Sequence, residues 1–193
     1  HGIERAHGSY AARAADPDTD VVYVASLQPG HVGDAITMLE AGKHVLVEKP
    51  AGATLEEVAS MQRCAQAHGV QCVPVHNYVY EPALERTRTL IDRGDLGKLV
   101  SVHVLYNIHH PEAVAQRYPG VIRQIMTHHA YVLLYLAGVP VSAAGMKATI
   151  NDGSVDQENL AVATLQLKGG AIAHLQASFA ADDHAGDPWT FLV

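Results

Sequence analysis

A lysine that directly precedes a proline is the first residue with a possible chemical role. Lys49 follows His44–Val47, an apolar run typical of a buried strand, and it precedes Pro50. An ammonium group in a crevice at a strand end loses hydration, which lowers its pKa, and it can donate a hydrogen bond to a substrate hydroxyl or carbonyl. Glu48 stands beside it and can orient the ammonium or balance its charge. The same residues also fit a plain surface lysine, so the neighbouring elements must decide between the two interpretations.

A histidine on a predicted helix is the second candidate. Apolar residues at helical spacing predict a helix over residues 121–137, and His128 falls on a different face from the apolar stripe, together with Gln124 and Tyr131. Histidine exchanges protons near neutral pH because its unperturbed pKa is about 6.5, so His128 is the candidate general base. Packing in the core is the other interpretation of His128. His129 lies within the apolar stripe, and we predict a hydrogen-bonded core residue there.

Metal ligation and covalent catalysis find little support in the sequence. The chain has 13 histidines, and the adjacent pairs His109–His110 and His128–His129 raise the question of a metal-dependent hydrolase. Adjacent side chains on a strand or helix point apart, and neither a His-x-x-x-His nor a Cys-x-x-Cys spacing accompanies the pairs, so we predict no metal site. Ser26 lacks the context of a nucleophilic serine, and Cys64 and Cys72 are predicted to be reduced core thiols.

The elements that position Lys49 alternate between strand and helix. Val21–Val24 is a short β-branched and aromatic run, as in a parallel strand buried on both faces, so we expect helices on both sides of the sheet. The periodicity predicts strands over 21–24, 44–47 and 71–75 and helices over 30–41 and 54–69. Such βαβ units bind ligands at the carboxyl ends of their strands, which is where Lys49 stands.

The pattern becomes antiparallel in the second half of the chain. A helix over 81–93 precedes the change. Long β-rich runs then predict strands over 99–109, 141–150, 158–167 and 171–179, and the apolar residues 189–193 are typical of the start of another strand. With the helix over 121–137, these runs predict an α+β domain with a mostly antiparallel sheet. We therefore divide the chain into domains at residues 1–77 and 78–193.

Composition limits the partners that the chain can have. The 193 residues carry a net charge of -7 and few basic clusters, which argues against a nucleic-acid partner and favours a small molecule. No apolar run approaches the roughly 20 residues of a membrane span, and the cytoplasm is the default location because no targeting segment is visible. An antiparallel sheet with one open face usually finds a partner, so we expect a homo-oligomer formed through the C-terminal sheet.

Several of these segments, taken in order, resemble the Gfo/Idh/MocA family of NAD(P)-dependent oxidoreductases. The matching segments are DVVYVA at 20–25 with Pro29–His31, AGKHVLVEKP at 41–50, NYVYEP at 77–82, LIDRGDLGK at 90–98 and the helix between Gly120 and Gly138. The resemblance implies an α/β fold, in which the C-terminal part of a Rossmann-type dinucleotide-binding domain is followed by an α+β domain for substrate binding and oligomerisation.

The resemblance also implies a reaction and roles for single residues. The reaction would transfer a hydride between NAD or NADP and a secondary alcohol of a sugar, polyol or cyclic diol, with Lys49 and His128 as the catalytic residues. The implied cofactor-binding residues are Ser26, Pro29, His31, Glu48, Lys49 and Asn77. The implied substrate-binding residues are Lys49, Gln124, His128 and Tyr131.

The sequence departs from the family pattern at several positions. Gln124 and Tyr131 stand where aspartate is common, while Tyr78 and Val79 replace residues that are often polar or basic. The family's Gly-x-Gly-x-x-Gly turn, which holds the cofactor pyrophosphate, does not occur in these residues. We therefore expect an internal fragment that is inactive by itself. A non-catalytic binding or regulatory protein with the same fold is the alternative.

Overall fold

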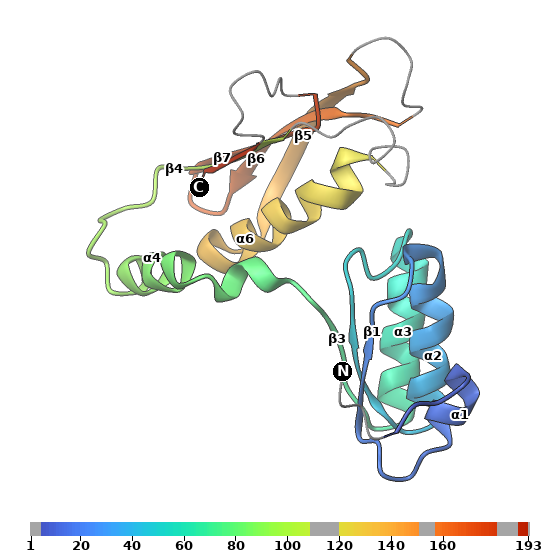
Figure 1. Ribbon diagram of the computed structural model, residues 1–193. Coiled ribbons are helices and arrows are strands. Elements are labelled where there is room, and N and C mark those ends of the chain that lie inside the picture. The colour runs from blue at the N-terminus through green and yellow to red at the C-terminus, as the bar shows by residue number, and fades with distance from the viewer. Residues whose placement is uncertain (1–4, 109–119, 151–156, 181–188, 193) are drawn as a thin grey trace. The chain divides into compact units, whose positions relative to one another are not determined.

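The computed structural model describes residues 5–108, 120–150, 157–180 and 189–192 (Figure 1). The chain forms two compact units, residues 1–76 and 77–193, and each is described here by itself. The His109–His110 pair and Val193 lie outside the described residues. No helix in the described ranges is long and apolar enough to cross a membrane.

The first unit is a three-stranded parallel sheet with helices between its strands. Its elements are α1 (Tyr10–Ala14), β1 (Val21–Val24), the 3₁₀ turn η1 (Gln28–Gly30), α2 (His31–Glu40), β2 (His44–Val47), α3 (Leu55–Ala67) and β3 (Cys72–Pro74). The strands lie in the order β1-β2-β3, and both pairs are parallel. The predicted alternation of strand and helix in this half is therefore confirmed.

Local sequence explains where α3 begins. Thr54 accepts a hydrogen bond from the backbone N–H of Glu57, and the Glu57 carboxylate accepts one from the backbone N–H of Thr54, so the two residues form a capping box. Glu57 also accepts from Ala53 at 2.5 Å. The cap fixes the chain between β2 and α3, close to the end of β2 that carries Lys49.

The helices of this unit cover a single face of the sheet, which corrects the expectation of helices on both sides. In Figure 1, α2 and α3 lie side by side against one face. Buried side chains of α2 and α3 pack there on the inward residues of β1 and β2. On the other face, Tyr23, Leu46 and Val73 form one cross-strand row and are 53%, 39% and 43% exposed. The apolar run of β1 thus does not show that helices cover both faces of the sheet, because in the described residues they cover one.

The second unit combines helices with a five-stranded sheet. Its elements are the 3₁₀ turn η2 (Asn77–Tyr80), α4 (Pro82–Asp92), β4 (Ser101–Ile108), the π-helical turn η3 (Ile122–Met126), α6 (Thr127–Ala137), β5 (Pro140–Ala148), β6 (Leu160–Leu167), β7 (Ile172–Ser178) and β8 (Trp189–Leu192). The strand order is β5-β6-β7-β4-β8. All neighbours are antiparallel except β4 and β7, which run parallel, so the predicted mostly antiparallel sheet is confirmed.

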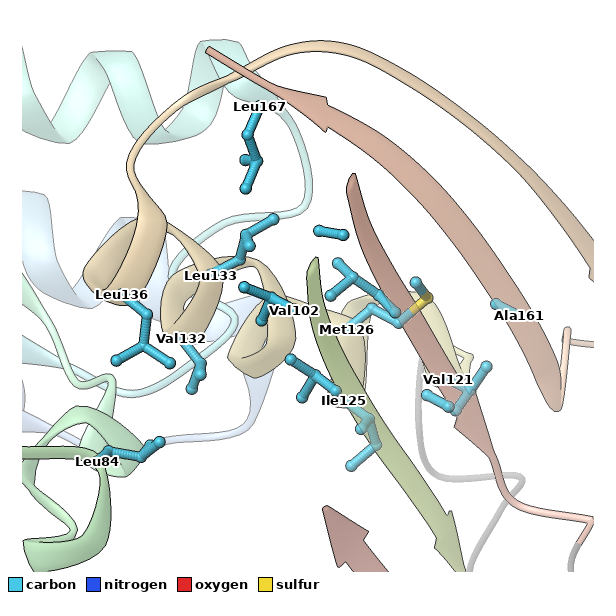
Figure 2. Packing of buried hydrophobic residues seen from close by; sticks show 14 of the residues in the cluster. Leu84, Val102, Val121, Ile125, Met126, Val132, Leu133, Leu136, Ala161 and Leu167 are labelled. Carbon is cyan, nitrogen blue, oxygen red and sulfur yellow. The ribbon is translucent and has the colours of Figure 1, made fainter. Parts of the chain in front are cut away.

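The core of the second unit lies between η3, α6 and the inward face of this sheet. Figure 2 shows Ile125, Val132 and Leu133 of the helical segment packed towards Val102 of β4. Alternate residues of the strands point to this face, and small residues such as Ala161, Ala173 and Ala177 let the helix approach closely. Burial of this face holds the helix that carries His128 against the sheet.

The predicted helix over 121–137 begins with a π-helical turn instead of a regular α-helical one. Val121 is fully buried, whereas Ile122, which α-helical periodicity assigns to the buried stripe, is 36% exposed. A π turn bonds residue i to residue i+5 and so contains an extra residue, which shifts the face of the residues before α6. The apolar pattern alone gave no sign of this shift.

Candidate active site

Three neighbouring strand ends meet at one edge of the first sheet. Because the strands are parallel and adjacent, Ser26 after β1, Lys49 after β2 and His76 after β3 all follow carboxyl ends on the same side. This edge is where open α/β sheets bind their ligands. Ser26 and Lys49 were predicted as site residues, but His76 was missed. The sequence could have indicated His76 as a site residue, because it directly follows Cys72–Val75, the apolar run of the third predicted strand.

Lys49 is a half-buried ammonium group at this edge. Burial lowers the pKa of Lys49, and the nearby Glu48 carboxylate acts in the opposite direction. Burial also lowers the pKa of His76, and the positive charge of Lys49 adds to that lowering. The peptide bond between Lys49 and Pro50 is cis. Perturbed groups gathered at a strand edge are typical of a functional site.

Glu48 connects this lysine to the neighbouring strand. One carboxylate oxygen accepts a hydrogen bond from the Tyr23 hydroxyl, and the other accepts from the backbone N–H of Lys49 at 3.0 Å. The bond to Glu48 raises the pKa of Tyr23, because it stabilises the protonated phenol. Sequence reasoning missed Tyr23. It lies opposite Leu46, and only this register places its side chain on the same face as Glu48.

His31 is buried between the loops that follow β1 and β2. It is the first residue of α2 and is 2% exposed. Its Nδ1 lies 2.9 Å from the carbonyl oxygen of Pro50, and its Nε2 lies 2.9 Å from the carbonyl oxygen of Ser26. Pro29 lies in η1, the turn that leads into α2. The side chain of His31 thus contacts the segment that carries Lys49 as well as the first loop.

The first loop is closely packed around Gly30. The Ser26 hydroxyl donates to Asp34 at 2.7 Å, and a Cβ atom at Gly30 would lie 3.1 Å from the Asp34 carboxylate and 3.2 Å from Ser26 Oγ. Ser26 Oγ keeps acceptor capacity, and Lys49 contributes a donor. A hydroxyl and an ammonium group therefore both follow strand ends at the carboxyl edge of the parallel sheet, where such sheets bind ligands.

A second group of predicted residues lies in the second unit, around His128. The His128 ring is 4% exposed and stacks on Tyr78, with ring centroids 4.1 Å apart and planes 13° apart. Burial raises the pKa of Tyr78, and a hydrogen bond with Tyr106 raises it further. Asn77 is the first residue of η2 and precedes Tyr78. The stack fixes the orientation of the imidazole that we predict to be the general base.

The other two predicted substrate-binding residues lie on the same helical segment. Gln124 is half-buried within η3, and Tyr131 on α6 is 39% exposed. Because the π turn separates Gln124 from α6, a spacing of four residues to His128 is not a regular α-helical turn there. The sharing of one face by Gln124 and His128 therefore stays a prediction.

His129 is a core residue, as predicted. It is fully buried, and desolvation lowers its pKa to about 4. The ring of Tyr106 approaches it edge-on, with ring centroids 6.5 Å apart. Tyr106 therefore contacts His129 and is hydrogen-bonded to Tyr78, the residue that stacks on His128. Sequence reasoning missed this tyrosine, which looks like any other residue of an alternating strand.

An apolar cavity of about 890 Å³ adjoins these aromatic residues within the second unit. It lies between α4 and β4, and Leu84, Ile91, Tyr78 and Tyr106 are among its lining residues. In the part of the chain that the structure describes, no group of three or more His, Cys, Asp or Glu side chains could hold a metal ion. Cys64 and Cys72 are both free and half-buried.

Comparison with known proteins places these features in a family. Residues 2–76 match the profile of an oxidoreductase family with an NAD-binding Rossmann fold, and residues 84–193 match the GFO/IDH/MocA C-terminal domain. The predicted family, the fold class and a nicotinamide nucleotide as the family's cofactor are thereby confirmed.

Individual relatives show which reactions occur among similar chains. A 1-carboxy-3-chloro-3,4-dihydroxycyclohexa-1,5-diene dehydrogenase of Comamonas testosteroni is 37% identical over 97 residues, which cover 50% of this chain and 24% of the relative. A 1,5-anhydro-D-fructose reductase of Ensifer adhaerens is 27% identical over 187 residues, which cover 93% and 56%. A solved levoglucosan dehydrogenase, in complex with NADH and levoglucosan, superposes with a TM-score of 0.86 at 24% identity, covering 98% of this chain and 56% of that one. The chain spans about half the length of the last two.

Proposed function

The chain belongs to the Gfo/Idh/MocA family of oxidoreductases, and on that premise we propose that the protein is an NAD(P)-dependent dehydrogenase. Its substrate would be a secondary alcohol of a sugar, polyol or cyclic diol. The observation that carries the proposal is Lys49, a half-buried lysine whose pKa burial lowers, at the carboxyl edge of a parallel sheet. The names of the relatives, a cyclic diene diol dehydrogenase and an anhydrofructose reductase among them, support this substrate class.

The roles of the side chains follow from their chemistry. Lys49 would donate a hydrogen bond to the substrate hydroxyl and so make its proton easier to remove. His128, oriented by its stack on Tyr78, would accept that proton as the general base. Glu48 would hold the Lys49 backbone through the bond to its N–H. The bound nicotinamide would supply the hydride acceptor.

The cofactor contacts of this edge are part of the proposal. Ser26 and Lys49 would face the nicotinamide end of the cofactor, with Pro29 and His31 shaping the loop beneath it and Asn77 bordering it from the next strand end. The choice between NAD and NADP depends on residues near the adenosine ribose.

Replacement of Lys49 tests the proposal. In the complete protein, Lys49→Ala should lower kcat by roughly 100-fold or more, because the group that polarises the hydroxyl is lost, while the dissociation constant of the cofactor changes little. Turnover is measured with NAD and NADP against a panel of sugars, inositols and cyclic diols, and cofactor binding by fluorescence titration.

Lys43→Ala is the matched control. Lys43 precedes β2 at the opposite end of the strand, where its ammonium donates to the Asp16 carbonyl oxygen at 2.9 Å. This variant should keep full turnover. Equal turnover of the Lys49→Ala variant and the unsubstituted protein would sink the dehydrogenase mechanism. Absence of turnover with any of these alcohols, although cofactor binds, would favour a non-catalytic binding protein with the same fold.

A further inference from the structure

His31 contacts two groups that can only accept hydrogen bonds. Its Nδ1 and Nε2 each lie 2.9 Å from a backbone carbonyl oxygen, those of Pro50 and Ser26 respectively. A neutral imidazole carries one N–H, so its other nitrogen would present a lone pair to a carbonyl lone pair at this distance. Only the imidazolium form donates to both oxygens.

From this geometry we propose that His31 is a buried imidazolium that positions Lys49, by tying the loop after β2 to the loop after β1. This role rests on the proposed function of Lys49, but the protonation state of His31 does not. Pro50 is the residue directly after Lys49, so a bond to its carbonyl oxygen restrains the backbone from which the lysine side chain extends. His31 is thus a positioning residue that need not touch the reacting atoms.

One carboxylate lies close to the first loop that His31 contacts. Asp34 lies three residues further along α2 and accepts a hydrogen bond from the hydroxyl of Ser26, whose carbonyl oxygen faces His31 Nε2. Glu48 directly follows β2, and the other titratable groups described at this edge are Tyr23, Lys49 and His76. A cation at a helix N-terminus works against the helix dipole, which makes the two carbonyl oxygens and the Asp34 carboxylate necessary.

The two loops gain a specific connection from this arrangement. Ser26 lies in the loop after β1, and Lys49 and Pro50 lie in the loop after β2, so one ring would fix the spacing between two proposed cofactor contacts. A displacement of about 1 Å in a catalytic group can lower the rate by about 100-fold. Loss of His31 should therefore act on kcat through Lys49.

The protonation state is tested directly by nuclear magnetic resonance. In the complete protein with ¹⁵N-labelled histidine, long-range ¹H–¹⁵N correlation at pH 7.5 should show both ring nitrogens of His31 protonated. The His31→Gln variant identifies the signal by its disappearance. A signal from a neutral tautomer at this pH would overturn the proposal, whatever the activity of the protein.

The positioning role is tested by a double-mutant cycle. His31→Gln alone should lower kcat by about 100-fold, whereas adding it to Lys49→Ala should lower kcat by no more than about twofold further, because both changes act on one group. Additive losses would overturn the positioning role. If Lys49→Ala itself leaves turnover unchanged, the proposed function fails, and the resonance experiment still decides the state of His31.

A control separates positioning from general damage to the fold. His44 lies at the opposite end of β2, and its Nδ1 accepts from the backbone N–H of Gln71. His44→Gln should leave kcat unchanged. Thermal unfolding of each variant shows whether it is folded at the assay temperature. If His31→Gln does not fold, sequential backbone and side-chain assignment of the unsubstituted protein identifies the His31 signal, and the resonance measurement still decides the protonation state.

Discussion

His129 makes the stability of the second unit depend on pH. Its folded-state pKa is lowered from 6.5 to about 4 by burial, so between these values the unfolded chain binds a proton that the folded chain does not. The stability that comes from keeping His129 neutral is fully present above pH 6.5 and is lost as the pH falls towards 4. At about 1.36 kcal/mol per pKa unit, the free energy of unfolding should fall by about 3 kcal/mol over this range.

Urea unfolding at a series of pH values measures this dependence. His129→Leu should flatten the curve between pH 6.5 and 4, because the titrating group is gone, even though the substitution changes the stability at neutral pH. His103→Gln replaces an exposed histidine of β4 and should leave the slope as it was. An unchanged slope in the His129→Leu variant would show that other groups carry the pH dependence.

At the scale of single residues, sequence predicts best where neighbours along the chain define the site. Lys49, Glu48 and Pro50 are consecutive, and the strand before them sets their place at the sheet edge. Tyr23 and His76 were missed because their proximity to Glu48 and Lys49 depends on how three strands pair. The position of His128 on its helix did not decide whether the side chain is buried. The ring that covers it belongs to Tyr78, which is distant in the sequence.

Gly120 and Glu158 set the start of the helical segment that carries His128. Gly120 has a φ of +91°, and a Cβ atom there would lie 2.4 Å from Glu158 Oε1. The backbone N–H of Val121 donates to the Glu158 carbonyl oxygen at 3.0 Å, and that of Ile122 donates to the Glu158 carboxylate at 3.3 Å. Glu158 also pairs with Lys147 at 3.6 Å. The residue two positions before β6 thereby anchors the N-terminus of the helical segment.

Gly120→Ala should destabilise this segment. A left-handed backbone conformation at a residue other than glycine costs of order 1–3 kcal/mol, and the Glu158 carboxylate must also move away from the helix N-terminus. Chemical denaturation measures the loss, with far-ultraviolet circular dichroism to confirm folding. Gly33→Ala on α2 is the control, since a Cβ atom there meets nothing within 4 Å, and it should be neutral or slightly stabilising. Equal stability of the two variants would refute the anchoring role.

Elements were predicted well wherever a local signal marks their ends. The sequence marks the start of α3 with the capping box of Thr54 and Glu57, and the start of α4 with Pro82 at its first position. The π turn η3 was not predictable, because hydrophobic spacing over five residues does not distinguish i+4 from i+5 bonding. The parallel pairing of β4 with β7 was likewise missed, since strand periodicity carries no information on which distant strand is the neighbour.

At the scale of the whole molecule, the outward face of the second sheet supports the proposed self-association. Two successive cross-strand rows on this face contain no Lys, Arg, Asp or Glu; they are Ala144, Thr164, His174 and His103, then Met146, Val162, Gln176 and Leu105. Met146 and Val162 face each other and are 79% and 38% exposed. An uncharged face of this kind can pack against a second copy of itself.

Light scattering of the complete protein tests this proposal. The molar mass of the unsubstituted protein in solution should be two or more times that of a single chain. The double variant Met146→Lys, Val162→Lys should have the mass of a single chain, because association would bury the new charges without partners. Leu27→Lys, at a residue of the first unit that is 87% exposed, should keep the oligomer. A single-chain mass before substitution would contradict the proposal, and an oligomer that survives the double change would place its interface elsewhere.

The order of the strands in the two sheets has a consequence for synthesis. In the first sheet each strand pairs with the next one in the sequence, with Val21 facing His44 and Val45 facing Cys72. In the second sheet β4 lies between β7 and β8, so Ser101 must find Ile172 and Leu105 must find Leu192. Pairings between distant segments form slowly. During synthesis the strands of the first sheet can therefore pair as they emerge from the ribosome, whereas both edges of β4 stay open until β7 is made and one edge stays open until β8 is made. Open strand edges are prone to aggregation, so chaperones would have most to protect during that interval.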